Sequence, residues 1–169
     1  MKKTLLILVA IVITFSSCSS RPTSPQSIIR HLCESEVGLP SGSLYFSDAA
    51  EGSAKSLEKE LLAVAYGIPI DFDGIESAAI WLSSVRHPCE FAIFLCKDAN
   101  AAEDISLFCN QRIRSLMQNA SLSAPLCNMS TAEYREYISG AFVTVSGRYV
   151  ALIISSDPDS ARRAFIKAL

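Results

Sequence analysis

Hydrophobic and β-branched residues alternate along two neighbouring segments, 141–146 and 149–155, as in paired β-strands. Between them, Gly147-Arg148 fits a two-residue type II′ turn, because glycine accepts a positive φ without a steric clash. The turn sets the register, and it pairs Val145 with Val150 and Val143 with Leu152. One face of the predicted hairpin is then wholly apolar: Ala141, Val143, Val145, Val150, Leu152 and Ile154.

A helix is predicted directly after this hairpin. Asp157 is a natural N-cap, since its carboxylate accepts amide hydrogens of the first turn, and Pro158 fits the first helical position. Apolar residues then recur at helical spacing on one stripe: Ala161, Ala164, Phe165 and Ala168. Segment 141–169 therefore reads as a ββα unit.

A second ββα pattern precedes it, with strands at 75–83 and 89–96, a connector at 84–88, and a helix from Asp98 to about Asn119. An offset of 59 residues places Asp98 on Asp157, and each half then reads helix, strand, strand, helix. Two interpretations remain open. The halves arose by duplication, or any ββα unit makes similar demands of its residues.

The remaining pattern predicts three more helices, one over 28–37, one from Ser56 to Gly67, and a short one after the capping-box sequence Ser130 to Glu133. Segment 44–46 is a short strand or a packed loop, and 120–129 is a loop. The predicted fold is α+β, a four-stranded antiparallel sheet from two hairpins with helices packed on one face. From the first hairpin, the predicted helix-facing residues are Ala78, Ile80, Leu82, Phe91, Ile93 and Leu95.

The opposite sheet face is unusually apolar for a solvated face, which normally carries more charge. Helices or a loop cover it, or it is an exposed patch of the kind that binds a partner or ligand. Besides Cys96, it would carry the five residues of the candidate binding face: Trp81, Phe94, Phe142, Tyr149 and Ile153.

The first residues have the pattern of an export signal, with two lysines before an apolar run from Leu5 to Phe15. Phe15-Ser16-Ser17-Cys18 resembles the bacterial lipobox, in which the cysteine is acylated, for example with palmitate. The alternative is an ordinary secretory signal with an incidental cysteine. We expect a signal peptide at 1–17, a polar tether at 18–27 and one domain at 28–169. The protein would be lipid-anchored to the cell membrane on its extracytoplasmic face.

Composition supports one domain, because half of the 169 residues are hydrophobic. The formal net charge is −2, and it becomes −4 without the two positive charges of Lys2 and Lys3. Nothing in this balance favours nucleic acid as a partner.

Candidate chemistry is sparse. If Cys18 carries lipid, an odd number of cysteines remains, so they cannot all pair internally: Cys33, Cys89, Cys96, Cys109 and Cys127. His87 and Cys89 are two apart and would point to the same side if extended, which allows a thiol-dependent enzyme as an alternative. No motif for a catalytic group, metal or cofactor stands out, and the expectation is none of the three.

Three stretches together resemble a family of lipoproteins of Gram-positive bacteria, the domain of unknown function 4358. They are AVAYGI at 63–68, FAIFLCKDANAAEDI at 91–105 and FVTVSGRYVALIISSDPDSARRAF at 142–165. The similarity covers most of the chain from about Ile28 onward. The resemblance implies export and the hairpin–helix architecture, and it brings no activity, ligand or site residues.

These patterns predict a membrane-tethered, non-enzymatic envelope domain that binds a protein, a peptide or a wall component. Two alternatives are a thiol-dependent enzyme using Cys89 and His87, and a structural accessory subunit of an envelope complex.

Overall fold

The computed structural model describes residues 23–169 except 37, 51–52 and 84–85. The predicted signal peptide and the lipidation site Cys18 lie outside the described residues, as does most of the predicted tether. The first helix begins at Pro25, inside the predicted tether, and Ser24 caps it by accepting from the Ser27 amide. The folded domain therefore starts before the expected boundary at Ile28.

The sheet has five strands in the described residues, and every neighbouring pair is antiparallel. The order across the sheet is β1-β2-β3-β5-β4. The strands are β1 (Gly42–Phe46), β2 (Ile75–Ser83), β3 (Glu90–Cys96), β4 (Phe142–Ser146) and β5 (Tyr149–Ile154). The α+β class is confirmed, while the predicted four strands become five because segment 44–46 pairs with β2 as an edge strand.

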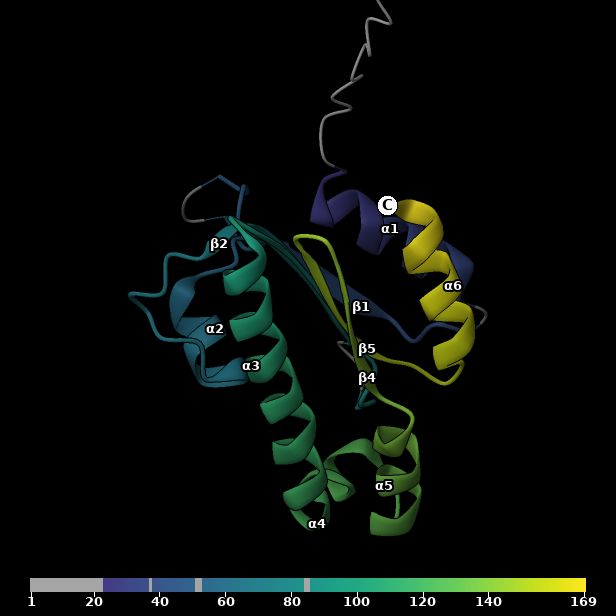
Figure 1. Cartoon of the computed structure of the whole chain (residues 1–169). Coiled ribbons are helices and arrows are strands. Elements are labelled where there is room, and N and C mark those ends of the chain that lie inside the picture. Colours follow the sequence, from purple (N-terminus) through teal and green to yellow (C-terminus); the bar gives the residue numbers. More distant parts are fainter. Residues whose placement is uncertain (1–22, 37, 51–52, 84–85) are drawn as a thin grey trace, which may run out of the picture.

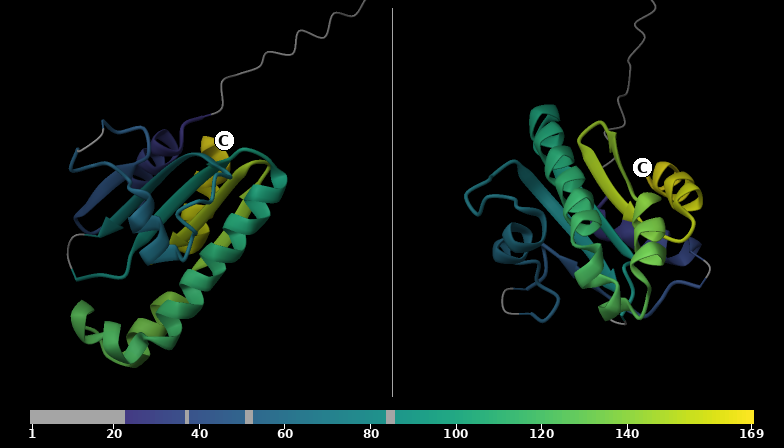
Figure 2. Two further views of the ribbon diagram at one scale, coloured as in Figure 1. Left: turned by 90° about the vertical axis from the view of Figure 1, so that its left-hand side faces the viewer. Right: turned by 90° about the horizontal axis from the view of Figure 1, so that it is seen from below.

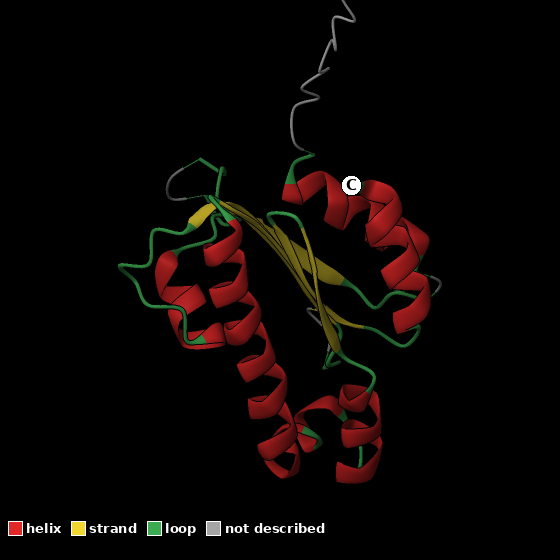
Figure 3. Cartoon of the chain, in the orientation of Figure 1, coloured by secondary structure: helices red, strands yellow, loops and turns green. Residues whose placement is uncertain are grey.

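Helices cover both faces of this sheet (Figures 1 and 3). One face packs against α2, α3 and α5, and we call it the α3 face. The other packs against α1 and α6, and we call it the α1–α6 face. The helices are α1 (Pro25–Ser35), α2 (Lys59–Tyr66), α3 (Ala99–Gln118), α4 (Ala120–Ser123), α5 (Thr131–Ser139) and α6 (Pro158–Ala168), with a 3-10 helix η1 (Pro125–Cys127). The expectation of helices on one face is wrong.

The second hairpin forms as predicted. Val145 pairs with Val150 and Val143 with Leu152. Gly147 has φ 58°, and Asn128 is the only described non-glycine residue with a positive φ. Arg148 therefore keeps a negative φ, which is the type II′ pattern, and the register follows from this turn.

Three of the predicted helix starts, those of α3, α5 and α6, are confirmed. Asp98 accepts from the Ala101 amide at 2.8 Å, and Asp157 accepts from the Ser160 amide at 2.9 Å. Ser130 and Glu133 form the reciprocal capping box of α5. These side chains satisfy amide groups that a helix leaves unbonded at its start, so local sequence fixes where each helix begins.

Helix α2 differs from its prediction. It starts after Glu58 rather than at Ser56, and it buries Leu62 and Tyr66. Val64, an apolar residue of the same helix, is exposed. The segment expected to be a loop, 120–129, contains α4 and η1.

The orientation of β3 is the main correction. Ala78 pairs with Phe94 and Trp81 pairs with Phe91, so Phe94 lies on the α3 face and Phe91 on the α1–α6 face. The predicted placement of Phe91 and Ile93 on the same face as Ala78 is therefore wrong. All seven residues of β3 are buried, Glu90 included, so no exposed position marks which side of the strand faces which helices.

The arrangement of the two ββα units argues against duplication. The two hairpins meet at the antiparallel strands β3 and β5, and a two-fold axis perpendicular to the sheet would relate them. Such an axis does not exchange the two faces of the sheet, so duplicated units would place both helices on the same face. Here α3 and α6 lie on opposite faces (Figure 2). The offset also equates Phe94 with Ile153, which belong to different faces. The shared demands of a ββα unit explain the similarity.

Candidate binding pocket

A pocket of about 310 Å³ opens on the α3 face, between α2 and the first half of β2. We call it the α2 pocket. Its floor is apolar, and its rim carries charged side chains of both signs. The floor is lined by Leu57, Leu62, Ile68, Phe72 and Ala78, and the charged residues around it are Lys59, Asp73, Glu76 and Lys97.

The connection between α2 and β2 builds the floor. Gly67 ends α2 in the left-handed conformation at φ 71°, and its amide donates to the Ala63 carbonyl at 2.9 Å. The chain then turns so that Ile68 is buried and the Phe72 amide donates to the Pro69 carbonyl. Local turn chemistry therefore directs two apolar side chains into the pocket.

Gly74 is required by close packing at the end of this connection. A Cβ at this position would lie 2.5 Å from Cζ of Phe72. Because the clash is with a ring packed edge-to-face against Phe108, at 6.1 Å between centroids, we expect any side chain at Gly74 to displace the pocket wall.

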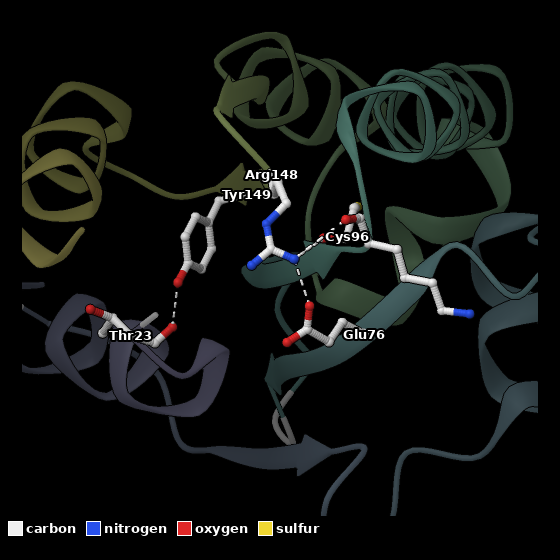
Figure 4. A network of polar contacts seen from close by, with 6 residues as sticks. Thr23, Glu76, Cys96, Arg148 and Tyr149 are labelled. Carbon is white, nitrogen blue, oxygen red and sulfur yellow. Dashed lines mark hydrogen bonds and ion pairs between the residues drawn. The ribbon is translucent and has the colours of Figure 1, made fainter. Parts of the chain in front are cut away.

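Two ion pairs hold the rim. Lys97 Nζ lies 3.1 Å from Asp73 Oδ2, and Arg148 Nη1 lies 2.6 Å from Glu76 Oε2. Arg148 also donates to the Cys96 carbonyl at 3.2 Å, which ties the hairpin turn to the end of β3 (Figure 4). Three of the four charged rim residues, Asp73, Glu76 and Lys97, are thus held in ion pairs. The apolar floor is the part of the pocket that could take up an apolar group of a ligand.

The structure does not bring together the five residues of the candidate binding face. Phe94 lies on the α3 face, where its ring meets Tyr66 edge-to-face at 5.7 Å. The other four lie on the α1–α6 face: Trp81, Phe142, Tyr149 and Ile153.

Those four are covered rather than open. Trp81 and Ile153 are buried beneath α1 and α6. The guanidinium of Arg162 lies 4.7 Å above the ring of Phe142, and the Tyr149 hydroxyl donates to the Thr23 carbonyl at 2.8 Å. The apolar character of this face is explained by packing.

The pair His87 and Cys89 also differs from the arrangement that catalysis needs. Nδ1 of His87 accepts from the backbone amide of Cys89 at 3.2 Å, and the His87 ring packs edge-to-face on Tyr137. Burial, partly offset by a hydrogen bond with Tyr137, raises the pKa of the Cys89 thiol to about 12. The thiol is therefore protonated at neutral pH, and Nδ1 of His87 is engaged by the Cys89 backbone amide rather than by the thiol.

We therefore expect Cys89 to alkylate slowly in the folded protein. A pKa of about 12 against the ordinary 9.0 leaves roughly a thousandfold less thiolate at neutral pH. Iodoacetamide labelling, read by peptide mass spectrometry, should modify Cys89 at least about a hundredfold more slowly in the native chain than in urea. Equal rates in both conditions would show that burial does not shield the thiol, and only faster labelling in the native chain would restore the thiol enzyme as the better interpretation.

The cysteines inside the described residues are all free: Cys33, Cys89, Cys96, Cys109 and Cys127. Burial raises the pKa of Cys33 and of Cys96 to about 11. In the part of the chain that the structure describes, no group of three or more His, Cys, Asp or Glu side chains could hold a metal ion.

A buried charge pair is the feature that sequence reasoning missed. Glu90, at the start of β3, accepts from the Tyr66 hydroxyl at 2.6 Å and from Arg112 Nη2 at 2.9 Å. Its side chain is only 5% exposed, and that of Arg112 is 25% exposed. A signal was present, since Glu90 is the one charged residue in an apolar strand and Arg112 interrupts the apolar stripe of α3.

This pair changes the titration of its neighbours. Burial and the Glu90 carboxylate raise the pKa of Tyr66 well above its ordinary value. Burial alone would lower the pKa of Arg112, but Glu90 outweighs it and raises that pKa. Arg112 thus keeps its charge, and Tyr66 keeps its proton. The Nε atom of Arg112 is buried and has no hydrogen-bond partner among the described residues.

Over residues 23–169 without the gaps named above, no helix has the length and apolar character needed to cross a bilayer. The resemblance to the lipoprotein family stays a prediction. Comparison of this chain with protein-family models, with curated proteins and with solved structures gives no match.

Proposed function

We propose that this chain is a non-enzymatic binding domain of the cell envelope, held on the extracytoplasmic face of the membrane by lipid on Cys18. The proposed anchor is supported by the lipobox-like sequence at Phe15 to Cys18. The proposed binding activity is supported by one observation, the α2 pocket with its apolar floor and paired ionic rim.

The pocket fits binding better than catalysis. Its ionisable residues stand at the rim, and two of the four acid and base groups, Asp73 and Lys97, neutralise each other. A general acid or base needs a perturbed pKa and a position beside the reacting group. The floor offers neither, since Leu57, Leu62 and Ile68 present only carbon.

The size of the pocket limits its occupant. At about 310 Å³ it lies at the lower end of small-molecule sites, which begin near 300 Å³. An apolar side chain of a protein or peptide partner, or an apolar portion of a wall component, would fill the floor. The rim charges of both signs would then contact the polar part of the partner.

Photo-crosslinking in cells tests this function. With benzoylphenylalanine in place of Lys59, an exposed residue lining the pocket, we expect a discrete crosslinked species after irradiation. The matched control places the same group at Leu107, which is exposed on α3 away from the pocket. Labelling at Leu107 alone, or at neither position in cells that carry the anchored protein, would contradict binding at the α2 pocket.

The accessory-subunit alternative makes a different demand. It requires a stoichiometric complex that is lost when this lipoprotein is deleted, whereas a binding domain leaves its partner intact in the deletion strain. Blue-native electrophoresis of membranes with and without the protein separates the two.

A further inference from the structure

The start of the described chain is fixed to one end of the sheet. The Thr23 carbonyl accepts from the Tyr149 hydroxyl at 2.8 Å, next to the hairpin turn (Figure 4). In that turn, Arg148 donates to the Cys96 carbonyl at 3.2 Å. Thr23, the turn at Gly147-Arg148 and the end of β3 therefore lie together, and we call this the tethered end.

Helix α3 runs from the tethered end to the opposite end of the domain, so its length gives the distance between them. Its N-cap Asp98 follows β3 at the tethered end, and the helix runs for 20 residues to Gln118. At 1.5 Å per residue it is about 30 Å long. Beyond its last turn lie α4, η1 and α5, which form the far end of the domain (Figures 1 and 2).

The reach of the proposed anchor is shorter than the domain. Cys18 precedes Thr23 by five residues, and five residues at full extension span at most about 18 Å. If the far end faced the bilayer, Thr23 would stand about 30 Å above it, beyond the reach of a chain whose Cys18 sits at the lipid surface. That orientation is excluded on length alone.

We propose that the tethered end is the surface of this domain that meets the bilayer, and that the α4–η1–α5 end points away from the membrane. The inference rests on the proposed lipid anchor at Cys18. It places the rim residues Glu76 and Lys97 on the membrane side, because Arg148 binds Glu76 and the Lys97 carbonyl lies 3.4 Å from the same guanidinium. It leaves Leu122 and Leu126, both exposed, on the outermost surface.

Two serines give a matched pair of probe positions. Ser146 ends β4 at the hairpin turn, and Ser121 lies in α4, and both are exposed. Each is replaced by cysteine, S146C or S121C, in the full-length lipidated chain with Cys33 and Cys127 changed to serine. A fluorophore is attached, and the protein is incorporated into phosphatidylcholine–phosphatidylglycerol vesicles that contain a lipid with a nitroxide on its headgroup.

We expect the nitroxide to quench the probe at position 146 several-fold more strongly than the probe at position 121. Equal quenching, or stronger quenching at 121, in chains that float with the vesicles would overturn the orientation while leaving the anchor intact. Flotation of the protein with the vesicles tests the lipid anchor separately. The Cys18→Ala variant is the control, and it should not bind the vesicles. A full-length chain that does not float either would overturn the anchor and the orientation together.

Discussion

Replacing Glu90 with leucine should cost roughly 3 kcal/mol of unfolding free energy. The change leaves the Arg112 guanidinium in the core without its carboxylate, and it removes the acceptor of the Tyr66 hydroxyl. Breaking a buried pair from one side usually costs about 3–5 kcal/mol, and the lower value applies because Arg112 keeps 25% of its side chain exposed. Urea unfolding followed by Trp81 fluorescence measures the loss.

Two controls separate the buried charge from the mutation itself. The triple variant Glu90→Leu, Tyr66→Phe and Arg112→Met removes every polar member at once, and most of the lost stability should return. Asp73→Asn breaks the rim ion pair with Lys97. Because the side chain of Asp73 is 88% exposed, this change should cost at most about 1 kcal/mol of unfolding free energy. A Glu90→Leu loss as small as that of Asp73→Asn would show that the buried pair is not a structural requirement.

Phe165→Ala should cost about 3–5 kcal/mol, because it leaves a ring-sized cavity in the α1–α6 face. Phe165 has no exposed surface and packs in the same cluster as Trp81 and Phe91. We also expect the native fluorescence of Trp81 to change, since water gains access to the cluster. Equilibrium unfolding in urea gives the free energy, and emission spectra in buffer report the environment of the indole.

The neighbouring residue provides the control. Ile166 lies on the outer side of α6 and is 62% exposed, so Ile166→Ala should change stability by no more than about 0.5 kcal/mol. A Phe165→Ala loss within that range would mean that α6 does not close a core. The apolar sheet face beneath it would then again be a candidate binding surface.

The second hairpin was predictable because its determinants are local. Alternating residues show which side is buried, and Gly147 accepts the positive φ that the turn requires. Asp98, Asp157 and Ser130 likewise act within three residues of themselves, so their caps could be identified without knowing the fold.

The orientation of β3 could not be read from the sequence, because helices bury both sides of the strand. With Phe91, Ile93 and Phe94 all apolar, the alternation that identifies a half-buried strand is missing. The prediction placed Phe91 and Ile93 on the face of Ala78, whereas the observed register with β2 places Phe94 there. The predicted fold placed helices on one face, although cover of the opposite face by helices was one of the open alternatives.

The α2 pocket lay beyond sequence reasoning for another reason. Its floor joins Leu57 and Leu62 to Ala78 of β2, and only the packed fold brings them together. Glu90 and Arg112, in contrast, each break an apolar pattern, and that pair of exceptions was a usable signal for a buried contact.

The contact between Tyr149 and Thr23 also determines how the domain would respond to mechanical force. A pull on the chain before Thr23 would load this hydrogen bond first and then the start of α1. Helix α1 lies against the sheet through Ile28, Ile29 and Leu32, so tension would peel it away one turn at a time without shearing any strand. The domain would therefore yield to tension on its N-terminal side by exposing Trp81 while its five-stranded sheet stays paired.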